Sequence, residues 1–322
     1  MERVLDQPVR LRQSETARSL AAAFAMMVAL LLVAPLAIYP VFLMQALCFA
    51  LFACAFNLLI GYVGLISFGH ALFFGWASYL TAHAAKVWAL PPELAIIFGT
   101  AAAALLGLVA GGLAIRRQGI YFAMITLALA QMMYFFALRA KFTGGEDGIQ
   151  GVPRGRLFGL FDLSHELTMY GFVLLVVLAG FLLIYRIINS PFGEVLKAIR
   201  ENEPRAVSLG YRTERYKLVA FVLSATLAGL AGSMKSLVFQ LASLTDVHWT
   251  MSGDVVLMTL LGGLGTVFGP VVGAFLVIAM QNYLAPFGQW VLVIQGTTFV
   301  ACVLAFRRGI VGEIASRMRV SL

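Results

Sequence analysis

A chain of 322 residues in which 61% are hydrophobic and only 12% are charged has more apolar surface than a soluble core of that size could bury. A mean hydropathy of +0.92 excludes an ordinary soluble enzyme or binding domain and predicts an integral membrane protein. The net charge of +8 could indicate nucleic-acid binding, but most Lys and Arg residues cluster in alternate gaps between apolar runs. That distribution indicates membrane topology, so no nucleic-acid partner is expected.

Apolar runs close to the ~20 residues that a membrane-spanning helix needs recur along the whole chain. Residues 1–19 are polar and form a predicted tail. The apolar run after them is longer than a usual signal-peptide core and leads directly into another, so we expect a first span instead. The predicted spans are 20–39, 41–60, 65–85, 93–115, 119–138, 169–185 and 218–240.

The run from Asp254 to Leu284 is too long for one simple crossing. Its middle, LLGGLGTVFGP, carries the helix breakers Gly262, Gly263, Gly265, Gly269 and Pro270. One crossing would put the basic C-terminal tail outside, whereas two crossings or a re-entrant segment would put it inside. We expect the second arrangement, because it places most of the 23 Lys and Arg residues on the inner side.

The expected fold is therefore a single all-α membrane domain over residues 20–306, a polytopic helical bundle with about ten membrane segments. Some of these segments are interrupted by Gly or Pro, and the eighth is short and broken. Both tails, residues 1–19 and 307–322, are expected in the cytoplasm. Cys48, Cys54 and Cys302 lie in apolar runs without ligand-like spacing, so neither a disulfide framework nor a metal site is expected.

The largest charged island of the chain extends from Asn189 to Lys217. Phe192, Val195, Leu196 and Ile199 fall at positions i, i+3, i+4 and i+7, which predicts an amphipathic helix with one apolar face. Pro191 suits a first helical turn, Pro204 breaks the pattern, and a second short run ends at Gly210, which suits a left-handed cap. The two predicted helices, residues 191–210, are called the knob below. An ordinary solvated loop with an interfacial helix fits the same pattern.

A second glycine-rich stretch, GYVGLISFGHALFFG, loosely resembles LLGGLGTVFGPVVGA further along the chain. Small residues let membrane helices pack closely, which is the favoured interpretation of each stretch alone. The alternative is a pair of interrupted helices along a translocation path, because broken backbone at membrane depth needs protein or water beside it. The candidate path or helix-break residues are Gly61, Gly64, Ser67, Gly69, His70, Gly262, Gly263, Gly265, Gly269 and Pro270.

Several polar residues are predicted to lie inside spans, and an ionisable group at that depth is a functional candidate. They are Asn57, Ser67, His70, Thr126, Gln131, Lys235 and Gln281. We expect His70 to be packed or hydrogen-bonded rather than to relay protons. Lys235, near the outer end of its span, is expected to reach the membrane surface with its long side chain.

The predicted outer loop, residues 139–168, contains the Gly-rich turn TGGEDGIQGVPR. Glu146 and Asp147 lack the alternating acidic pattern of an EF-hand, so a structured turn, open to a partner contact, is expected rather than a calcium site. The sequence contains no P-loop, GxSxG, HExxH or CxxC motif. We therefore expect a protein without catalytic chemistry, cofactor or ATP hydrolysis of its own.

Four strings resemble the LivM-type permeases of bacterial branched-chain amino acid ABC importers. They are GLISFGHALFFGWASY, GIYFAMITLALAQMMYFFAL with TGGEDGIQGVPR, SPFGEVLKAIRENEPRAVSLGYRTERYKLVAFVLSATLAGLAGS and LMTLLGGLGTVFGPVVGAFL. The resemblance implies an inner-membrane permease subunit that moves branched-chain amino acids by alternating access. The implied partners are a second, LivH-like permease, two cytoplasmic ATP-binding subunits of the LivG and LivF types, a periplasmic solute-binding protein and membrane lipid.

The resemblance also implies that residues 189–217 form the loop that couples the permease to its ATPases. The residues assigned to it are Phe192, Gly193, Glu194, Lys197, Arg200, Glu201, Asn202, Glu203, Arg205, Ala206, Leu209 and Gly210. The segment from Glu203 to Gly210 is one residue longer than the usual glutamate, alanine and glycine loop of importer permeases. Pro204 also stands where that loop has an alanine, so the role is carried over to the segment rather than to single residues.

Two other classes remain as alternatives. An ion-coupled secondary transporter should carry membrane-embedded Asp or Glu, but every acidic residue is predicted in a loop or at a span boundary, such as Glu93 and Asp254. A channel-like structural protein would explain the glycines but not the amphipathic knob. Within the importer family, urea and other amino or organic acids are alternative substrates.

Overall fold

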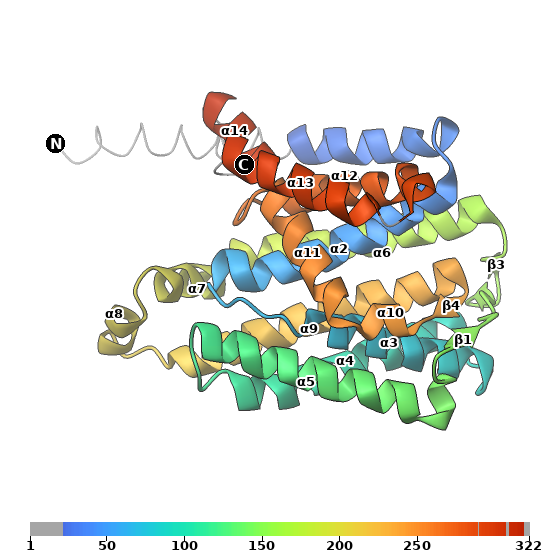
Figure 1. Cartoon of the computed structure of the whole chain (residues 1–322), viewed down its shortest axis with the longest axis horizontal. Helices are drawn as coiled ribbons and strands as arrows, with labels where there is room; N and C mark the ends of the chain where they lie inside the picture. The colour runs from blue at the N-terminus through green and yellow to red at the C-terminus, as the bar shows by residue number, and fades with distance from the viewer. Residues whose placement is uncertain (1–21, 289, 307–308, 319–322) are drawn as a thin grey trace.

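The computed structural model describes residues 22–288, 290–306 and 309–318 as a bundle of helices that run roughly along its long axis (Figure 1). The predicted tail at residues 1–19, together with Arg307 and Arg308, lies outside the described residues. Figure 1 places the knob at one end of the bundle, and four two-residue strands lie at the other. These ends are called the knob end and the strand end.

Six helices within the described ranges are long and apolar enough to cross a membrane. They are α2 (Pro40–Tyr62), α4 (Pro92–Ala114), α5 (Ile120–Arg139), α6 (Glu166–Ile188), α9 (Thr213–Phe239) and the stretch Trp290–Glu313, which includes α13 (Trp290–Ala305). The chain is thus a multi-pass helical membrane protein. The larger number of about ten segments stays a prediction, because the remaining apolar helices are shorter than the ~20 residues of a simple crossing.

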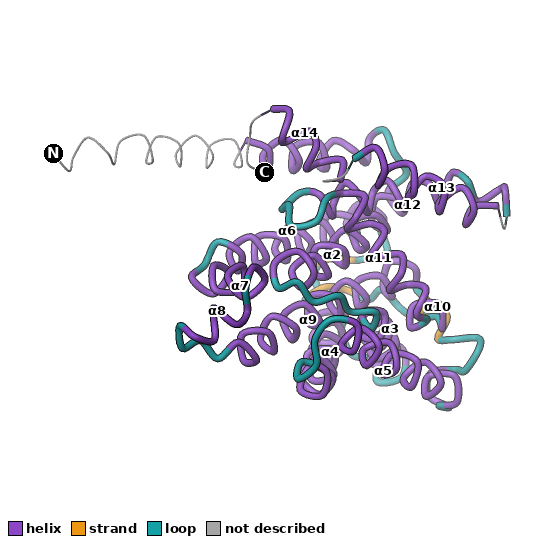
Figure 2. The backbone as a smooth tube through the Cα atoms, turned by 60° about the vertical axis from the view of Figure 1, so that its left-hand side comes forward, coloured by secondary structure: helices purple, strands orange, loops and turns teal. Residues whose placement is uncertain are grey.

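The shorter helices and the strands complete the bundle. The helices are Ala22–Leu36, whose end is η2 (Ala34–Leu36), then α3 (His70–Lys86), η3 (Lys141–Thr143), α7 (Pro191–Glu201), α8 (Glu203–Ser208), α10 (Leu244–Val247), α11 (Trp249–Gly262), α12 (Gly269–Tyr283), η4 (Ala285–Phe287) and α14 (Gly309–Met318). The strands are β1 (Ile149–Gln150), β2 (Arg156–Leu157), β3 (Phe161–Asp162) and β4 (Leu241–Ala242). In the turned view of Figure 2, α12, α13 and α14 lie together on one side.

Helix α2 is the centre of the core, and nearly all of its side chains are buried. A helix that is apolar on all sides must be enclosed, and α2 packs against α6, α9, α11 and α12. Helix α4 instead buries one stripe of small residues against α9, with Gly107 beside Ala225 and Gly111 beside Phe221. Its opposite side, which includes Leu105, is exposed as expected for a lipid-facing surface.

The run from Asp254 to Leu284 is not one helix but the antiparallel pair α11 and α12. Gly262 packs against Gly269 at the reversal, and Gly273 packs against Met258 one turn further along. A Cβ at Gly262 would overlap the Gly269 carbonyl, so the tight reversal requires glycine there. The run is therefore not one continuous helix, and the number of times it crosses the membrane stays a prediction.

Two predicted boundaries also differ from the structure. The span predicted over 65–85 becomes helical only at His70, and residues 64–69 form an extended segment between α2 and α3. Gly64 and Gly69 flank an apolar run that resembles a helix in sequence but has an irregular backbone. The predicted loop at 189–217 is also too long, because α9 begins at Thr213.

The outer loop folds back onto the end of α9. Strand β1 pairs with β4 immediately after α9, and β2 pairs with β3 in a small hairpin. Arg154 donates a hydrogen bond of 2.8 Å to the Val238 carbonyl, one of the last carbonyls of α9, which lack partners inside their helix. The expected structured turn is present and is anchored to the bundle.

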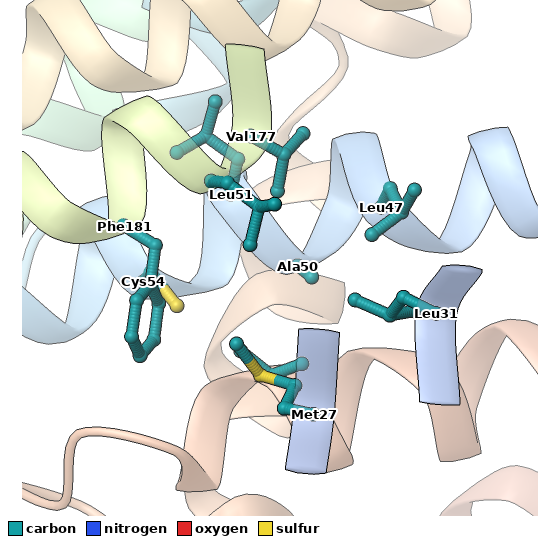
Figure 3. Close-up of a pocket in the computed structure, with 10 residues that line it drawn as sticks. Met27, Leu31, Leu47, Ala50, Leu51, Cys54, Val177 and Phe181 are labelled. Carbon is teal, nitrogen blue, oxygen red and sulfur yellow. The ribbon is translucent and has the colours of Figure 1, made fainter. Parts of the chain in front are cut away.

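A small apolar pocket lies where the helix Ala22–Leu36 packs over α2, α6 and α12 (Figure 3). It is lined by Met27, Leu31, Leu47, Ala50, Leu51, Cys54, Val177, Leu178, Phe181 and Val271. No side chain in this lining could orient a polar solute by charge, so the pocket is a packing feature of the bundle.

Candidate functional site

The knob consists of two helices whose ends are formed by local capping. Ser190 precedes α7, and its side chain accepts a hydrogen bond of 3.3 Å from the Gly193 amide. Asn202 ends α7 and begins α8, accepting a hydrogen bond of 3.0 Å from the Arg205 amide. The break predicted at Pro204 therefore falls two residues earlier, at Asn202, because the asparagine is the N-cap and the proline occupies the first turn.

The predicted apolar face of α7 points into the bundle. Leu196 and Ile199 are buried and Val195 is half-buried. Phe192, also half-buried, stacks on Tyr216 of α9 with 5.6 Å between ring centroids. Helix α7 is thus held against the bundle by its apolar stripe, as an amphipathic helix should be.

Most of the other knob residues are exposed. Glu194, Arg200, Glu201, Asn202, Arg205, Leu209 and Gly210 are exposed, Lys197 and Glu203 are half-buried, and Gly193 and Ala206 are buried. Leu209 is 70% exposed although it is apolar. Gly210 has a φ of 90°, so the left-handed cap predicted there is present.

Glu203 joins three segments at the knob end. It forms an ion pair with Lys217 in α9 and accepts a hydrogen bond of 2.8 Å from Gln118 in the connection between α4 and α5. The neighbouring Arg116 and Arg117 therefore lie at the same end of the bundle as the knob. Lys217 is only 3% exposed, so the start of α9 is firmly attached to α8.

Arg200 connects α7 to both glycine-rich stretches. Its guanidinium donates a hydrogen bond to the Gly61 carbonyl at the end of α2 and lies beside Gly265 in the reversal between α11 and α12. Gly64, just beyond α2, packs against the aliphatic part of the same side chain. Two stretches that are far apart in sequence thus meet at one residue of the knob.

Polar side chains of α2 hold the reversal in place. The Asn57 amide donates to the Thr266 carbonyl at 2.9 Å and accepts from the Gly265 amide at 3.0 Å. The Tyr62 hydroxyl donates to the Gly265 carbonyl, also at 2.9 Å. These bonds satisfy backbone groups that the glycine break leaves without helical partners.

A cleft of about 420 Å³ opens where these parts meet, and the site made of the cleft and its neighbours is called the junction below. Its lining is Gly61, Tyr62, Lys197, Arg200, Glu201 and Gly265. Helix α14 closes another side of the same reversal, because Gly309 packs directly against Gly263. The predicted helix-break residues Gly262, Gly269 and Pro270 are buried within the reversal.

The remaining candidate path residues lie deeper in the bundle. Ser67 is buried and accepts from the Gly69 amide, while the Phe68 amide donates to Thr126 of α5. His70 is fully buried, and its Nε2 lies 2.8 Å from the Ser224 hydroxyl of α9. This is the hydrogen-bonded histidine expected from the sequence, although its Nδ1 has no partner among the described residues.

Of two predictions about charged residues, the one for Lys235 is wrong and the one for Asp254 stays a prediction. Lys235 does not reach the membrane surface but is buried in an ion pair with Asp246. Asp254 lies in the second turn of α11, and its carboxylate accepts a hydrogen bond of 3.3 Å from Gln281. Hydropathy did not reveal these two environments, because α10 and α11 are too short to appear as one regular span.

The junction is a meeting point of the knob, the end of α2 and the reversal between α11 and α12. Among the described residues no group of three or more His, Cys, Asp or Glu side chains could hold a metal ion. The junction instead brings an exposed helical knob into contact with two helix breaks.

The chain belongs to the family described as the branched-chain amino acid transport system permease component, whose model matches residues 38–303. It is 27% identical over 267 residues to the LivM permease of the high-affinity branched-chain amino acid transport system of Escherichia coli K12. It is 26% identical over 272 residues to LivM of Salmonella typhimurium LT2. Each alignment covers 76% of this chain and 63% of the relative, so the chain spans less than two thirds of their length.

More distant relatives include the ribose import permease RbsC of Bacillus subtilis 168, which is 28% identical over 188 residues. That alignment covers 56% of this chain and 58% of the relative. No solved structure matches the chain.

Proposed function

We propose that this chain is a permease subunit of an ATP-driven importer that moves branched-chain amino acids across the bacterial inner membrane. The observation that carries the proposal is the junction, where Arg200 joins the knob to both glycine stretches, in a chain of the permease family. The transport of related solutes is the runner-up, because a sugar permease is among the relatives.

The proposed partners follow from the same family. They are a second, LivH-like permease, two ATP-binding subunits of the LivG and LivF types, and a periplasmic solute-binding protein. The knob would receive the ATPases through its exposed residues, among them Leu209 and Arg205. ATP hydrolysis would belong to those partners, since the sequence lacks a P-loop.

The proposed topology has the knob end in the cytoplasm. Arg116 and Arg117 share that end with the segment from Arg186 to Lys217, which has seven Lys and Arg residues, in agreement with an excess of Lys and Arg in cytoplasmic loops. In this topology α10 with α11 descends as the broken eighth segment, α12 returns as the ninth and α13 descends as the tenth. Both ends of the chain would then be cytoplasmic.

The proposed mechanism is alternating access. Closure of the ATPases would move the knob, and Arg200 would pass that movement to the end of α2 and to the reversal between α11 and α12. The bundle would open toward one side of the membrane at a time. The solute can shift this equilibrium only through its different affinity for the two states.

A matched pair of surface substitutions tests the proposal. Leu209→Asp places a charge on the exposed knob, and Leu160→Asp places one on the exposed β2–β3 hairpin at the strand end, where Leu160 is 82% exposed. The two ATPases should co-purify with the intact chain and with Leu160→Asp, but much less with Leu209→Asp. If the intact chain comes from its native membranes without any P-loop ATPase and still moves leucine, the importer proposal is wrong.

An ion-coupled secondary transporter is the second candidate. The observation that favours it is Asp254, an acidic side chain within α11, because embedded carboxylates often carry coupling ions. The family match favours the importer. A variant at Asp254, described in the Discussion, separates the two candidates.

A further inference from the structure

The ion pair between Lys235 and Asp246 is the most deeply buried charge contact in the described part of the chain. The Lys235 ammonium lies 2.8 and 2.7 Å from the two carboxylate oxygens of Asp246. Lys235 is 8% exposed and Asp246 is 2% exposed. Charges at such depth are costly in a membrane domain and are retained mainly where they have a function.

Asp246 also organises the helix that carries it. Its carboxylate accepts a hydrogen bond of 3.2 Å from the Ser243 amide, which completes a capping box at the start of α10. Helix α10 has only four residues and then bends at His248, whose backbone is extended. One turn of helix is not stable alone, so α10 depends on what holds it in place.

Helix α10 packs against α3 and α5, and a side chain of α9 reaches it. Gly75 of α3 lies directly against Val247, and a Cβ there would overlap the Val247 backbone. On the other side Lys235 of α9 reaches Asp246, and its ammonium lies 5.5 Å from the Phe239 ring centroid. The pair is thus the polar attachment between α9 and α10.

This attachment lies far from the knob along α9. The first turn of α9 is bound to the knob through the pair between Lys217 and Glu203. Lys235 lies near the opposite end of the same helix. At the far end of α11, the reversal at Gly265 contacts Arg200 of the knob. The segment formed by α10 and α11 thus meets a basic side chain at each end, Lys235 of α9 at one and Arg200 of the knob at the other.

We infer that Lys235 and Asp246 are a positioning pair that makes α10 and α11 follow the movement of α9, and the inference rests on the proposed function. An ion pair needs no exact packing of apolar surfaces, so it can stay formed while α9 shifts against α10. An apolar pair of similar size would hold α10 as firmly, but in one packed arrangement. The role of the two charges is thus to allow movement between α9 and α10 rather than to stabilise the fold.

The test uses the complete transporter in lipid nanodiscs and in proteoliposomes, with leucine as the probe solute. Lys235→Met and Asp246→Asn alone each leave one buried group without its partner and should lower the unfolding temperature. The double variant Lys235→Met with Asp246→Leu removes both charges and should restore that temperature to within a few degrees. Lys235→Arg keeps the charge pair.

The decisive readout is the number of leucine molecules imported per ATP hydrolysed. It should fall about tenfold in the stable double variant and stay near the unaltered value in Lys235→Arg. Tyr79→Phe is the matched control, because the Tyr79 hydroxyl is buried without a hydrogen-bond partner among the described residues. This control should leave the ratio unchanged.

Two outcomes would overturn the inference in different ways. A double variant that is stable and fully coupled means that the pair is only structural, while the importer function stands. An unaltered chain that recruits no ATPase overturns the proposed function, and the inference that rests on it falls as well.

Discussion

Lys217 of α9 and Glu203 of α8 form an ion pair in which the lysine is almost completely buried while the glutamate is partly open to water. This pair, with the hydrogen bond from Gln118 to the same carboxylate, attaches the knob to α9 and to the connection between α4 and α5. A force on α8 is therefore passed directly to the start of α9.

Replacing Lys217 by Met should loosen this attachment. The substitution leaves Glu203 half-buried without its cation, and the expected loss of unfolding free energy is about 1–2 kcal/mol, below the full cost of a buried pair because Glu203 is partly solvated. Thermal unfolding in detergent measures the change. Lys197→Met removes the exposed pair with Glu194 and is the control, expected to change the free energy by less than about 0.5 kcal/mol.

The reversal between α11 and α12 should not tolerate a methyl group at Gly262. Gly262→Ala would force the helices apart at the Gly269 carbonyl, with an expected loss of about 1–3 kcal/mol in stability and a clear loss of leucine uptake. Gly253→Ala, in the same helix, has open space at its Cβ position. It should be neutral or slightly stabilising in the same unfolding assay, and equal effects of both variants would contradict the close packing.

Asn57 should be sensitive to a change that removes only its donor. Asn57→Asp can still accept from the Gly265 amide, but it places a carboxylate oxygen against the Thr266 carbonyl. The expected loss is about 1–3 kcal/mol in unfolding free energy, with reduced uptake. Asn189→Asp, on an exposed residue that bonds only within its own turn, is the matched control. Wild-type stability of Asn57→Asp would show that the reversal is held by other contacts.

Asp254→Asn separates the importer from an ion-coupled transporter. The amide can keep a hydrogen bond with Gln281 but cannot carry a coupling ion or proton. An ATP-driven importer should retain leucine uptake within about twofold, whereas a carrier that needs the carboxylate should lose nearly all of it. The measurement is leucine uptake into proteoliposomes by Asp254→Asn and by the unaltered chain, driven either by ATP or by a proton gradient.

The parts of the fold that were predictable are those with a local cause. The long spans follow from length and hydropathy, and α7 follows from the spacing of Leu196 and Ile199 on one face. Ser190 and Asn202, the residues that cap the two knob helices, are of types that the sequence alone marks as typical N-caps. Local patterns therefore located the knob and placed its ends to within a few residues.

The missed features depend on contacts between distant segments. Nothing in the local pattern around Lys235 reveals Asp246 as its partner, because that contact exists only when α10 folds back beside α9. The bond from Arg200 to Gly61 similarly joins separate segments. The helix predicted to begin at Leu65 begins only at His70, because tertiary contacts hold the first part of this apolar run in an irregular conformation that hydropathy cannot distinguish from helix.

The pairing of β1 with β4 has a consequence for the biogenesis of the protein. Gln150 lies opposite Leu241, so the strand at the outer loop has no partner until all of α6 to α9 has been synthesised. At ~5–20 residues per second, a ribosome needs roughly 5 to 20 s for the chain between them. The ladder can close only after α9 has been inserted, and its formation therefore marks the completion of membrane integration for the whole middle of the chain.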